Sequence, residues 1–208
     1  MPRPPRVGRG SLRDADLRHG LRHGDLVLRR MNRSDRAAWQ RLRESNIDWL
    51  TPWEATNPGP PAPSMTFAEY VRQQRAQARQ DIGYAYVLEW RGQVVGQLTI
   101  AGVARGSLHS AHIGYWISEH VAGRGLMTRA VALAIDHSFG ALGLHRVEIN
   151  VRPENAASLR VPQKLGLREE GLRRRYLHIQ GQWRDHRSFA ITAEEAPGSL
   201  LDRLPAPE

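Results

Sequence analysis

The residues best suited to chemistry form a glycine-containing turn in the middle of the chain. An apolar strand is expected to end near Ser118, the turn contains Gly123 and Gly125, and an apolar helical pattern begins at Leu126. Glycines let backbone N–H groups approach an anion closely, and the start of a helix adds the positive end of its dipole. The spacing therefore predicts a cradle for a pyrophosphate group, with Arg124 adding charge at its rim.

Three ligand types, and an ordinary strand-to-helix turn, compete for this motif. A dinucleotide-binding fold needs Gly-x-Gly-x-x-Gly after the first strand, but the third position here is Thr128 and several strands come before it. A phosphate-binding loop that ends in Gly-Lys-Ser/Thr needs a lysine, and this turn has none. Coenzyme A, whose pyrophosphate also needs a cradle, is the third ligand.

Composition narrows the chemistry further. The 208 residues contain no cysteine, which excludes disulfides, thiolate metal sites and a cysteine nucleophile, and fits a reducing cytoplasm. We predict no metal site. No run approaches the roughly 18 apolar residues of a membrane helix, and no apolar segment of a secretory signal follows the N-terminus. The net charge is +9 and is carried almost entirely by arginine, with Lys164 as the single lysine.

The sequence predicts one domain between two tails. Residues 1–24 hold six arginines among proline and glycine, so we expect a flexible basic arm. This arm is either a solvated tail or a segment attracted to RNA or the ribosome, because phosphate attraction requires only charge. In the second case, deleting Met1–His23 abolishes salt-sensitive ribosome binding, and unchanged binding rejects the idea. The domain is expected over 25–192, with a loose Pro-containing tail over 193–208.

Hydrophobic periodicity predicts helices and strands around one mixed sheet, an α+β fold. Ser34 is expected to cap the first helix, and Thr66-Phe-Ala-Glu69 is a capping box for the second. Asn57–Pro63 is expected to be a loop. The expected strands are Asp25–Met31, Tyr84–Glu89, Gln93–Ala101, His109–Ser118, Arg146–Val151, Arg168–Ile179 and Trp183–Ile191, and the expected helices are 34–46, 66–80, 126–141 and Asn155–Leu165.

Motifs spread over the chain form a recognisable set. They are Leu50-Thr-Pro-Trp-Glu54, Ile113-Gly-Tyr-Trp-Ile117, Gly123-Arg-Gly-Leu126, His145-Arg-Val-Glu148, Arg152-Pro-Glu-Asn-Ala-Ala-Ser158, Lys164-Leu-Gly-Leu-Arg-Glu-Glu-Gly171, Arg174-Arg-Tyr-Leu177 and Trp183-Arg-Asp-His186. The set resembles the GNAT acetyltransferases, and in particular their RimJ/RimL branch, over about Leu26 to Thr192. The resemblance implies a mixed, mostly antiparallel sheet flanked by helices. It also implies acetyl-CoA as co-substrate and protein N-termini as acceptors, including those of ribosomal proteins.

The resemblance assigns a coenzyme A site. The family's Q/R-x-x-G-x-G/A motif falls on His120-Val-Ala-Gly-Arg-Gly125, where His120 replaces Gln or Arg, and backbone N–H groups would hold the pyrophosphate. The strand Ile113–Ile117 would pair with the pantetheine arm, and a backbone N–H near Tyr115–Ile117 would polarise the thioester carbonyl. Asn155 and Ser158 match the N-x-x-S that lies near the sulfur. The implied cofactor residues are Ile113, Tyr115, Trp116, Ile117, Val121, Gly123, Arg124, Gly125, Leu126, Met127, Asn155 and Ser158.

One residue of this site departs from regular helix chemistry. Pro162 lies inside the expected helix Asn155–Leu165, where it removes one helical hydrogen bond and clashes with the carbonyl of Ser158. Such a proline costs about 3 kcal/mol. We expect a kink or an early break of the helix, which would shift Ser158.

The acceptor amine must attack as a neutral base. Roughly 10–15% of an N-terminal α-amine with a pKa near 7.8 is neutral at pH 7, against about 0.04% of a lysine with a pKa near 10.4. A general base therefore matters less for an N-terminus. Glu148 is the first candidate base, because it leaves the apolar face of its strand, followed by His112 and Glu119. Tyr176 is the candidate acid for the leaving thiolate, and Ser158 near the sulfur completes the predicted catalytic set.

The acceptor groove is expected between a loop with two tryptophans and the turn His178–Asp185. Trp49 and Trp53 would bracket a peptide backbone, and Glu54 or Asp185 would meet the incoming ammonium. Two other functions stay open at this stage. One is acetylation of a small amine such as a polyamine or an aminoglycoside. The other is a CoA-binding or ribosome-associated module without catalysis, and the oligomeric state is not predicted.

Overall fold

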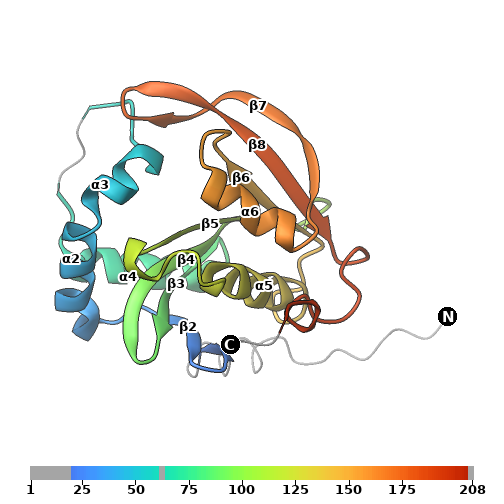
Figure 1. The fold of residues 1–208 in the computed structure, drawn as a ribbon, viewed down its shortest axis with the longest axis horizontal. Helices are drawn as coiled ribbons and strands as arrows, with labels where there is room; N and C mark the ends of the chain where they lie inside the picture. Colours follow the sequence, from blue (N-terminus) through green and yellow to red (C-terminus); the bar gives the residue numbers. More distant parts are fainter. Residues whose placement is uncertain (1–19, 61–63, 206–208) are drawn as a thin grey trace.

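The structure, a computed structural model, describes residues 20–60 and 64–205. One 8-stranded sheet runs through it in the order β1-β2-β3-β4-β5-β6-β8-β7, with helices against its faces (Figure 1). Neighbouring strands are antiparallel except β5 and β6, which are parallel. The predicted α+β fold with a mixed, mostly antiparallel sheet is confirmed.

The strands follow the predicted ones closely, because alternating apolar residues must face the helices that cover the sheet. The chief differences are one additional short strand at the start and a longer fourth strand. The strands are β1 (Leu21–His23), β2 (Leu26–Arg30), β3 (Gly83–Trp90), β4 (Gln93–Ala104), β5 (Ser110–Ile117), β6 (Arg146–Val151), β7 (Arg168–Ile179) and β8 (Gln182–Thr192).

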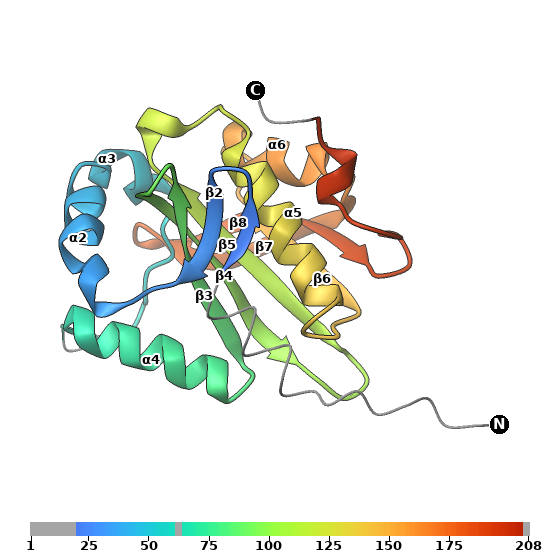
Figure 2. The same cartoon turned by 90° about the horizontal axis from the view of Figure 1, so that it is seen from below.

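The helices form a layer on each side of the sheet. Figure 2 shows α2 and α4 on one side and α5 and α6 on the other. Helix α5 is the most buried, and Ala130, Val131 and Ile135 on it have no exposed surface. None of the helices in the described part of the chain is long and apolar enough to cross a membrane. The α-helices are α2 (Arg36–Glu44), α3 (Ile47–Leu50), α4 (Phe67–Arg79), α5 (Leu126–Phe139) and α6 (Ala156–Lys164).

The helix starts confirm one capping prediction and correct another. Thr66 accepts from the Glu69 N–H and the Glu69 carboxylate accepts from the Thr66 N–H, so the capping box of α4 is present. Ser34 does not cap the first helix. Instead Asn32 accepts from the Ser34 N–H and starts a 3₁₀ turn, Arg33–Asp35, that leads into α2. Asparagine is as good a cap as serine, and Asn32, two residues before Ser34, accepts from an unpaired N–H at the start of the helical segment.

Strands β5 and β6 pair at one end only and then separate. The two strands pair over only three residues, Ser110–His112 with Arg146–Glu148. Beyond that point β5 continues to pair with β4 as far as Ile117, while β6 continues to pair with β8. One edge of β5 between Ile113 and Ile117 is therefore left without a partner strand.

The end of the predicted basic arm belongs to the sheet. Leu21–His23 forms β1 and pairs with β2, so the prediction of a flexible arm is wrong for these three residues. Residues 1–19 lie outside the described residues, and their RNA- or ribosome-binding role stays a prediction. A deletion that tests it should end at His19, because removing Leu21–His23 would also take a strand from the sheet.

The predicted loose tail is likewise held against the domain over the residues described. Ala196 and Leu200 are buried in the main core, and a 3₁₀ turn, Leu201–Arg203, follows them. Asp136 on α5 anchors this segment, because its carboxylate accepts from the Ser199 hydroxyl at 2.6 Å and the Leu200 N–H at 2.8 Å. The prediction of a loose tail is therefore wrong for residues 193–205.

The expected break at Pro162 does not occur. Helix α6 runs from Ala156 to Lys164 with the proline inside it. Leu159 and Val161, which come shortly before the proline, are buried. Their packing keeps the helix together although Pro162 cannot donate its helical hydrogen bond.

Replacing Asp136 with alanine should loosen the C-terminal segment. Asp136→Ala removes the acceptor of the Ser199 hydroxyl and of the N–H of the buried Leu200, so we expect about 1–3 kcal/mol less free energy of unfolding. Urea unfolding measures the loss, and Asp202→Ala, which alters an exposed carboxylate of the same segment, should cost less than about 0.5 kcal/mol. Equal effects of the two changes would contradict the anchoring role of Asp136.

Candidate active site

A cavity of about 570 Å³ opens where β5 leaves β6. Its walls come from β5, the glycine turn, the start of α5, α6, and two elements that carry the tryptophans. Trp49 lies in α3 and Trp53 in the 3₁₀ turn Thr51–Trp53 that follows it, so the loop expected for both residues is wrong. Ten predicted cofactor residues line it, namely Tyr115, Trp116, Ile117, Val121, Gly123, Gly125, Leu126, Met127, Asn155 and Ser158. Ile113, which is buried, and Arg124, whose guanidinium lies over the Trp90 ring, are not on its wall.

The glycine turn leads into a helix start that has no side-chain cap from the described residues. Gly123 and Gly125 have φ angles of 82° and 75°, a conformation that a side chain disfavours. Gly125 is the N-cap of the 14-residue helix α5, and no side chain of the described residues caps this end. The N–H groups of Leu126 and Met127 therefore point into the cavity end without an intrahelical acceptor, beside the positive end of the helix dipole.

The open edge of β5 offers backbone groups to a ligand. The Ser118 N–H donates to the Val95 carbonyl at 2.8 Å, and hydrogen bonds alternate along an antiparallel pair. The N–H and C=O groups of Tyr115 and Ile117 therefore face away from β4, toward the cavity. The Ile117 carbonyl accepts from the Trp49 indole N–H at 3.0 Å, which agrees with this alternation.

The start of α6 forms the opposite wall. The Asn155 side chain accepts from the Ser158 N–H at 3.0 Å and caps the helix, so its capping role is observed. Arg160 and Lys164 also line the cavity and add positive charge on the α6 side. Their contribution was missed, because their place at the wall depends on how α6 faces β5.

The residues predicted for the acceptor groove on α3 and the following 3₁₀ turn, here called the aromatic segment, lie at one end of the cavity. Trp49, Trp53 and Glu54 line it together with Trp116 and the uncharged side chains of Gln97 and Thr99. The Glu54 carboxylate is paired with Arg43, with 2.8 Å between Nη2 and Oε2, and the Arg43 guanidinium lies over the Trp116 ring. The pairing of Arg43 with Glu54 is not predicted from the sequence, because no local motif links the two residues.

The aromatic segment and the residues just after it are held by contacts from distant parts of the chain. The Thr56 N–H donates to the His178 carbonyl at 2.8 Å, and Arg152 donates to the Pro52 carbonyl at 2.7 Å. The Arg152 guanidinium also lies 5.2 Å from the centre of the Trp53 ring. The predicted neighbourhood of this segment and the turn after His178 is therefore observed.

The predicted catalytic side chains are not brought together. The Glu148 carboxylate receives hydrogen bonds from Arg146 and Arg173, and Glu148 does not line the cavity. Its cross-strand neighbour His112 and the candidate acid Tyr176, which accepts from Arg173 at 3.2 Å, also lie off the cavity wall. Of the predicted catalytic set, Ser158 alone lines it.

The remaining candidates have structural partners. Asp185 accepts from the Arg175 N–H at 2.7 Å and does not line the cavity. Glu119 is off the wall as well, although its N–H donates to the buried Asn46 side chain, which also accepts from the Ser118 hydroxyl. Asn46 thereby fixes the end of β5, a positioning role that local sequence signals did not mark.

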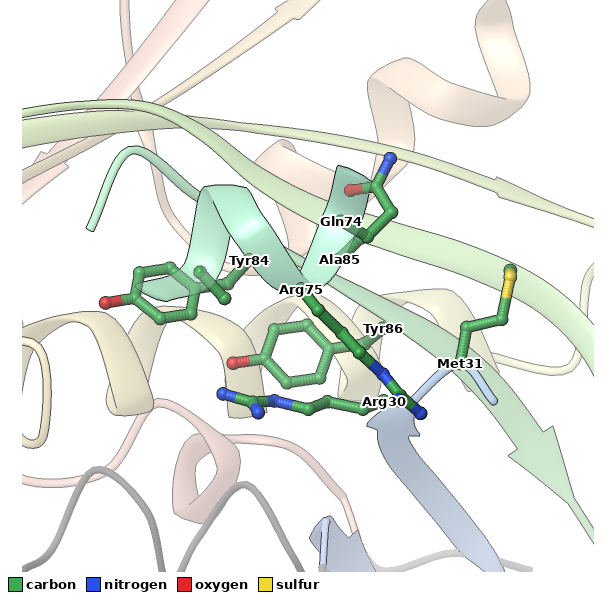
Figure 3. Close-up of a pocket in the computed structure, with 8 residues that line it drawn as sticks. Arg30, Met31, Gln74, Arg75, Tyr84, Ala85 and Tyr86 are labelled. Atoms are coloured by element: carbon green, nitrogen blue, oxygen red, sulfur yellow. The ribbon is translucent and has the colours of Figure 1, made fainter. Parts of the chain in front are cut away.

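A second hollow in the described part of the chain is far smaller than this cavity. It lies between α4 and the strand residues Tyr84, Ala85 and Tyr86 and holds about 10 Å³ (Figure 3). That is the space of a single water. Within the described residues, no three or more His, Asp or Glu side chains are grouped to hold a metal ion. The larger cavity is therefore the candidate active site.

Comparisons with known proteins agree with this geometry. Mycobacterium smegmatis RimJ, solved in complex with CoA-disulfide, matches with a TM-score of 0.79 and 42% identity over 86% of this chain and 87% of that one. The probable N-acetyltransferase YjcK of Bacillus subtilis is 40% identical over 48% of this chain and 55% of that protein. The ribosomal protein uS5-alanine N-acetyltransferase of Escherichia coli is 36% identical over 51% of this chain and 55% of that protein. The chain thus spans about half the length of these curated relatives.

A family model described as an acetyltransferase (GNAT) domain matches residues 25–168. The match extends over more than half of the chain and includes the open edge of β5, the glycine turn and the whole of α6. The similarity to RimJ agrees with the branch that the motifs resemble. The chain therefore belongs to the GNAT acetyltransferase family.

Proposed function

We propose that this protein transfers an acetyl group from acetyl-CoA to the N-terminal α-amine of a ribosomal protein in the cytoplasm. The observation that carries the proposal is the continuous path from the open edge of β5 to the uncapped start of α5. The open strand edge suits an arm that contains amide groups, and the helix start next to it suits a pyrophosphate. Mycobacterium smegmatis RimJ, which is 42% identical, was solved with CoA-disulfide.

The residues of the cavity fit coenzyme A in kind and in order. The N–H groups from Gly123 to Met127 suit a pyrophosphate, since a helix start with glycine φ angles above 70° holds anions. The outward N–H and C=O groups of Tyr115 and the outward N–H of Ile117 suit the amides of the pantetheine arm, which would add to the sheet as a short strand. The Ile117 C=O already accepts from Trp49. Acetyl-CoA supplies the acetyl group as a thioester.

The cavity favours an acceptor that needs no strong base. Its two carboxylates among the described lining residues, Glu54 and Glu154, are paired with Arg43 and Arg152. The amine nitrogen forms the new bond to the acetyl carbon while the carbon–sulfur bond breaks, the amine proton passes to water and the thiolate leaves. An N–H of Tyr115 or Ile117 would stabilise the charge on the acetyl oxygen.

The same pairing disfavours a small polycationic acceptor. Polyamines and aminoglycosides carry several positive charges, which need several carboxylates close together in a site. Glu54 and Glu154 are each neutralised by an arginine, and Arg160 and Lys164 add positive charge to the cavity. A protein N-terminus brings a single ammonium group and a peptide backbone that Trp49 and Trp53 can flank.

A panel of amines tests this function. With acetyl-CoA, we expect coenzyme A release with peptides that have a free N-terminal Ala or Ser. An N-blocked lysine peptide should react roughly 300-fold more slowly, because so little of its amine is neutral at pH 7. Release with spermidine or an aminoglycoside alone would move the function to small amines. Coenzyme A binding without any turnover would favour the non-catalytic module.

The glycine turn allows a matched test of cofactor binding. Gly123→Ala and Gly106→Ala both place a side chain at a φ near 70–80° with no atom within 4 Å of the new Cβ, so both should cost about 1–2 kcal/mol of stability. Calorimetry should show about tenfold weaker CoA binding for Gly123→Ala and no change for Gly106→Ala, which lies in the turn between β4 and β5. Unchanged binding in Gly123→Ala would remove the turn from the pyrophosphate site.

A further inference from the structure

Pro162 leaves one carbonyl of α6 without its helical partner. In a regular helix the N–H of residue 162 would donate to the carbonyl of Ser158, four residues earlier. Proline has no N–H, and its ring pushes that carbonyl outward. The Ser158 carbonyl therefore needs a hydrogen bond from outside the helix, since an unpaired carbonyl in a folded interior is costly.

The missing donor comes from the neighbouring strand. The Tyr115 hydroxyl, on β5, donates to the Ser158 carbonyl at 3.1 Å. Burial raises the pKa of Tyr115 well above its ordinary value, so the hydroxyl keeps its proton and stays a donor at any working pH. The phenol group thus occupies the place that a backbone N–H of residue 162 would have taken.

Two hydrogen bonds hold the backbone of Ser158. Its N–H donates to the Asn155 side chain at 3.0 Å, and its carbonyl accepts from Tyr115. The Ser158 hydroxyl makes no hydrogen bond within the described residues, and Ser158 lines the cavity. The peptide groups on both sides of this hydroxyl are therefore held, while the hydroxyl itself is available to a ligand.

The bond also spans the cavity. Tyr115 contributes its own backbone N–H and C=O to the open edge of β5, and its side chain reaches α6 on the opposite wall. One residue therefore sets the distance between the two walls that face the same ligand. No other hydrogen bond among the described residues joins a side chain of β5 to α6.

We propose that Tyr115 is a positioning residue for coenzyme A, which replaces the N–H that Pro162 lacks and so holds Ser158 and the α6 wall at the correct distance from β5. The inference rests on the proposed function, because it takes coenzyme A as the ligand of the cavity. It predicts that the need for the Tyr115 hydroxyl depends on the proline.

A double-mutant cycle tests this dependence. The wild type, Tyr115→Phe, Pro162→Ala and the double variant are compared by calorimetry with coenzyme A alone, so that no acceptor is needed. Tyr115→Phe should weaken binding about tenfold, or about 1.4 kcal/mol. Pro162→Ala restores the N–H, so the double variant should bind within about threefold of Pro162→Ala. A tenfold loss on Tyr115→Phe in both backgrounds, or in neither, would overturn the proposal.

The readouts separate positioning from folding. Tyr84→Phe is the matched control. Tyr84 lies on β3, its hydroxyl donates to the Asp81 carboxylate, and neither residue lines the cavity. It should lower the melting temperature and leave the Kd for coenzyme A unchanged. If Tyr115→Phe behaves in the same way, its role is structural only and the proposal fails. If Tyr115→Phe does not fold, binding by the double variant at the level of Pro162→Ala still supports the rescue, and its failure to bind overturns it.

The result is distinguishable from failure of the proposed function. A wild-type protein that binds no coenzyme A would reject the proposed function itself. Wild-type binding without coupling between Tyr115 and Pro162 would reject only the positioning role. In the assay with acetyl-CoA, Tyr115→Phe should raise the KM for acetyl-CoA far more than the KM for the peptide acceptor.

Discussion

The rest of this structure depends on the parting of β5 and β6 after three paired residues. If β5 and β6 stayed paired along their whole length, their backbone N–H and C=O groups would bond to each other and leave no open edge. Because the pairing stops at His112, the backbone of β5 from Ile113 to Ile117 is exposed along one edge, and the cavity fills the gap. A ligand with amide groups can complete this edge, so the interruption that weakens the sheet is the feature that makes a binding site.

An open strand edge in the middle of a sheet must be supported from outside. Asn46 holds the end of β5 through the Ser118 hydroxyl and the Glu119 N–H, and Trp49 takes the Ile117 carbonyl. Tyr115 ties the middle of the strand to α6. These contacts come from elements more than forty residues away in the sequence, so the shape of the cavity depends on tertiary packing rather than on β5 alone.

Local patterns therefore predicted the elements and the glycine turn, and failed where long-range contacts decide. Periodicity placed most helices and strands within a few residues, and the spacing of Gly123 and Gly125 predicted the turn before α5. The strand Leu21–His23 and the anchored segment after Thr192 carry weak local signals and are held by β2 and by Asp136. Glu148 is predicted as a base from its place on β6, but Arg173 from β7 donates to its carboxylate, in addition to Arg146 two residues away on the same strand.

The pairing of the carboxylates bears on selectivity as well as on rate. A site with a strong base could deprotonate a lysine side chain and would lose the natural difference between the two kinds of amine. The carboxylates that line the described cavity, Glu54 and Glu154, are bound to arginines, so under the proposed function the acceptor would have to bring its own neutral amine. The pKa difference between the two amines then favours an N-terminus by roughly 300-fold at pH 7, before any contact with the acceptor is made. Under the proposed function, arginine pairing would thus act as a filter for the α-amine.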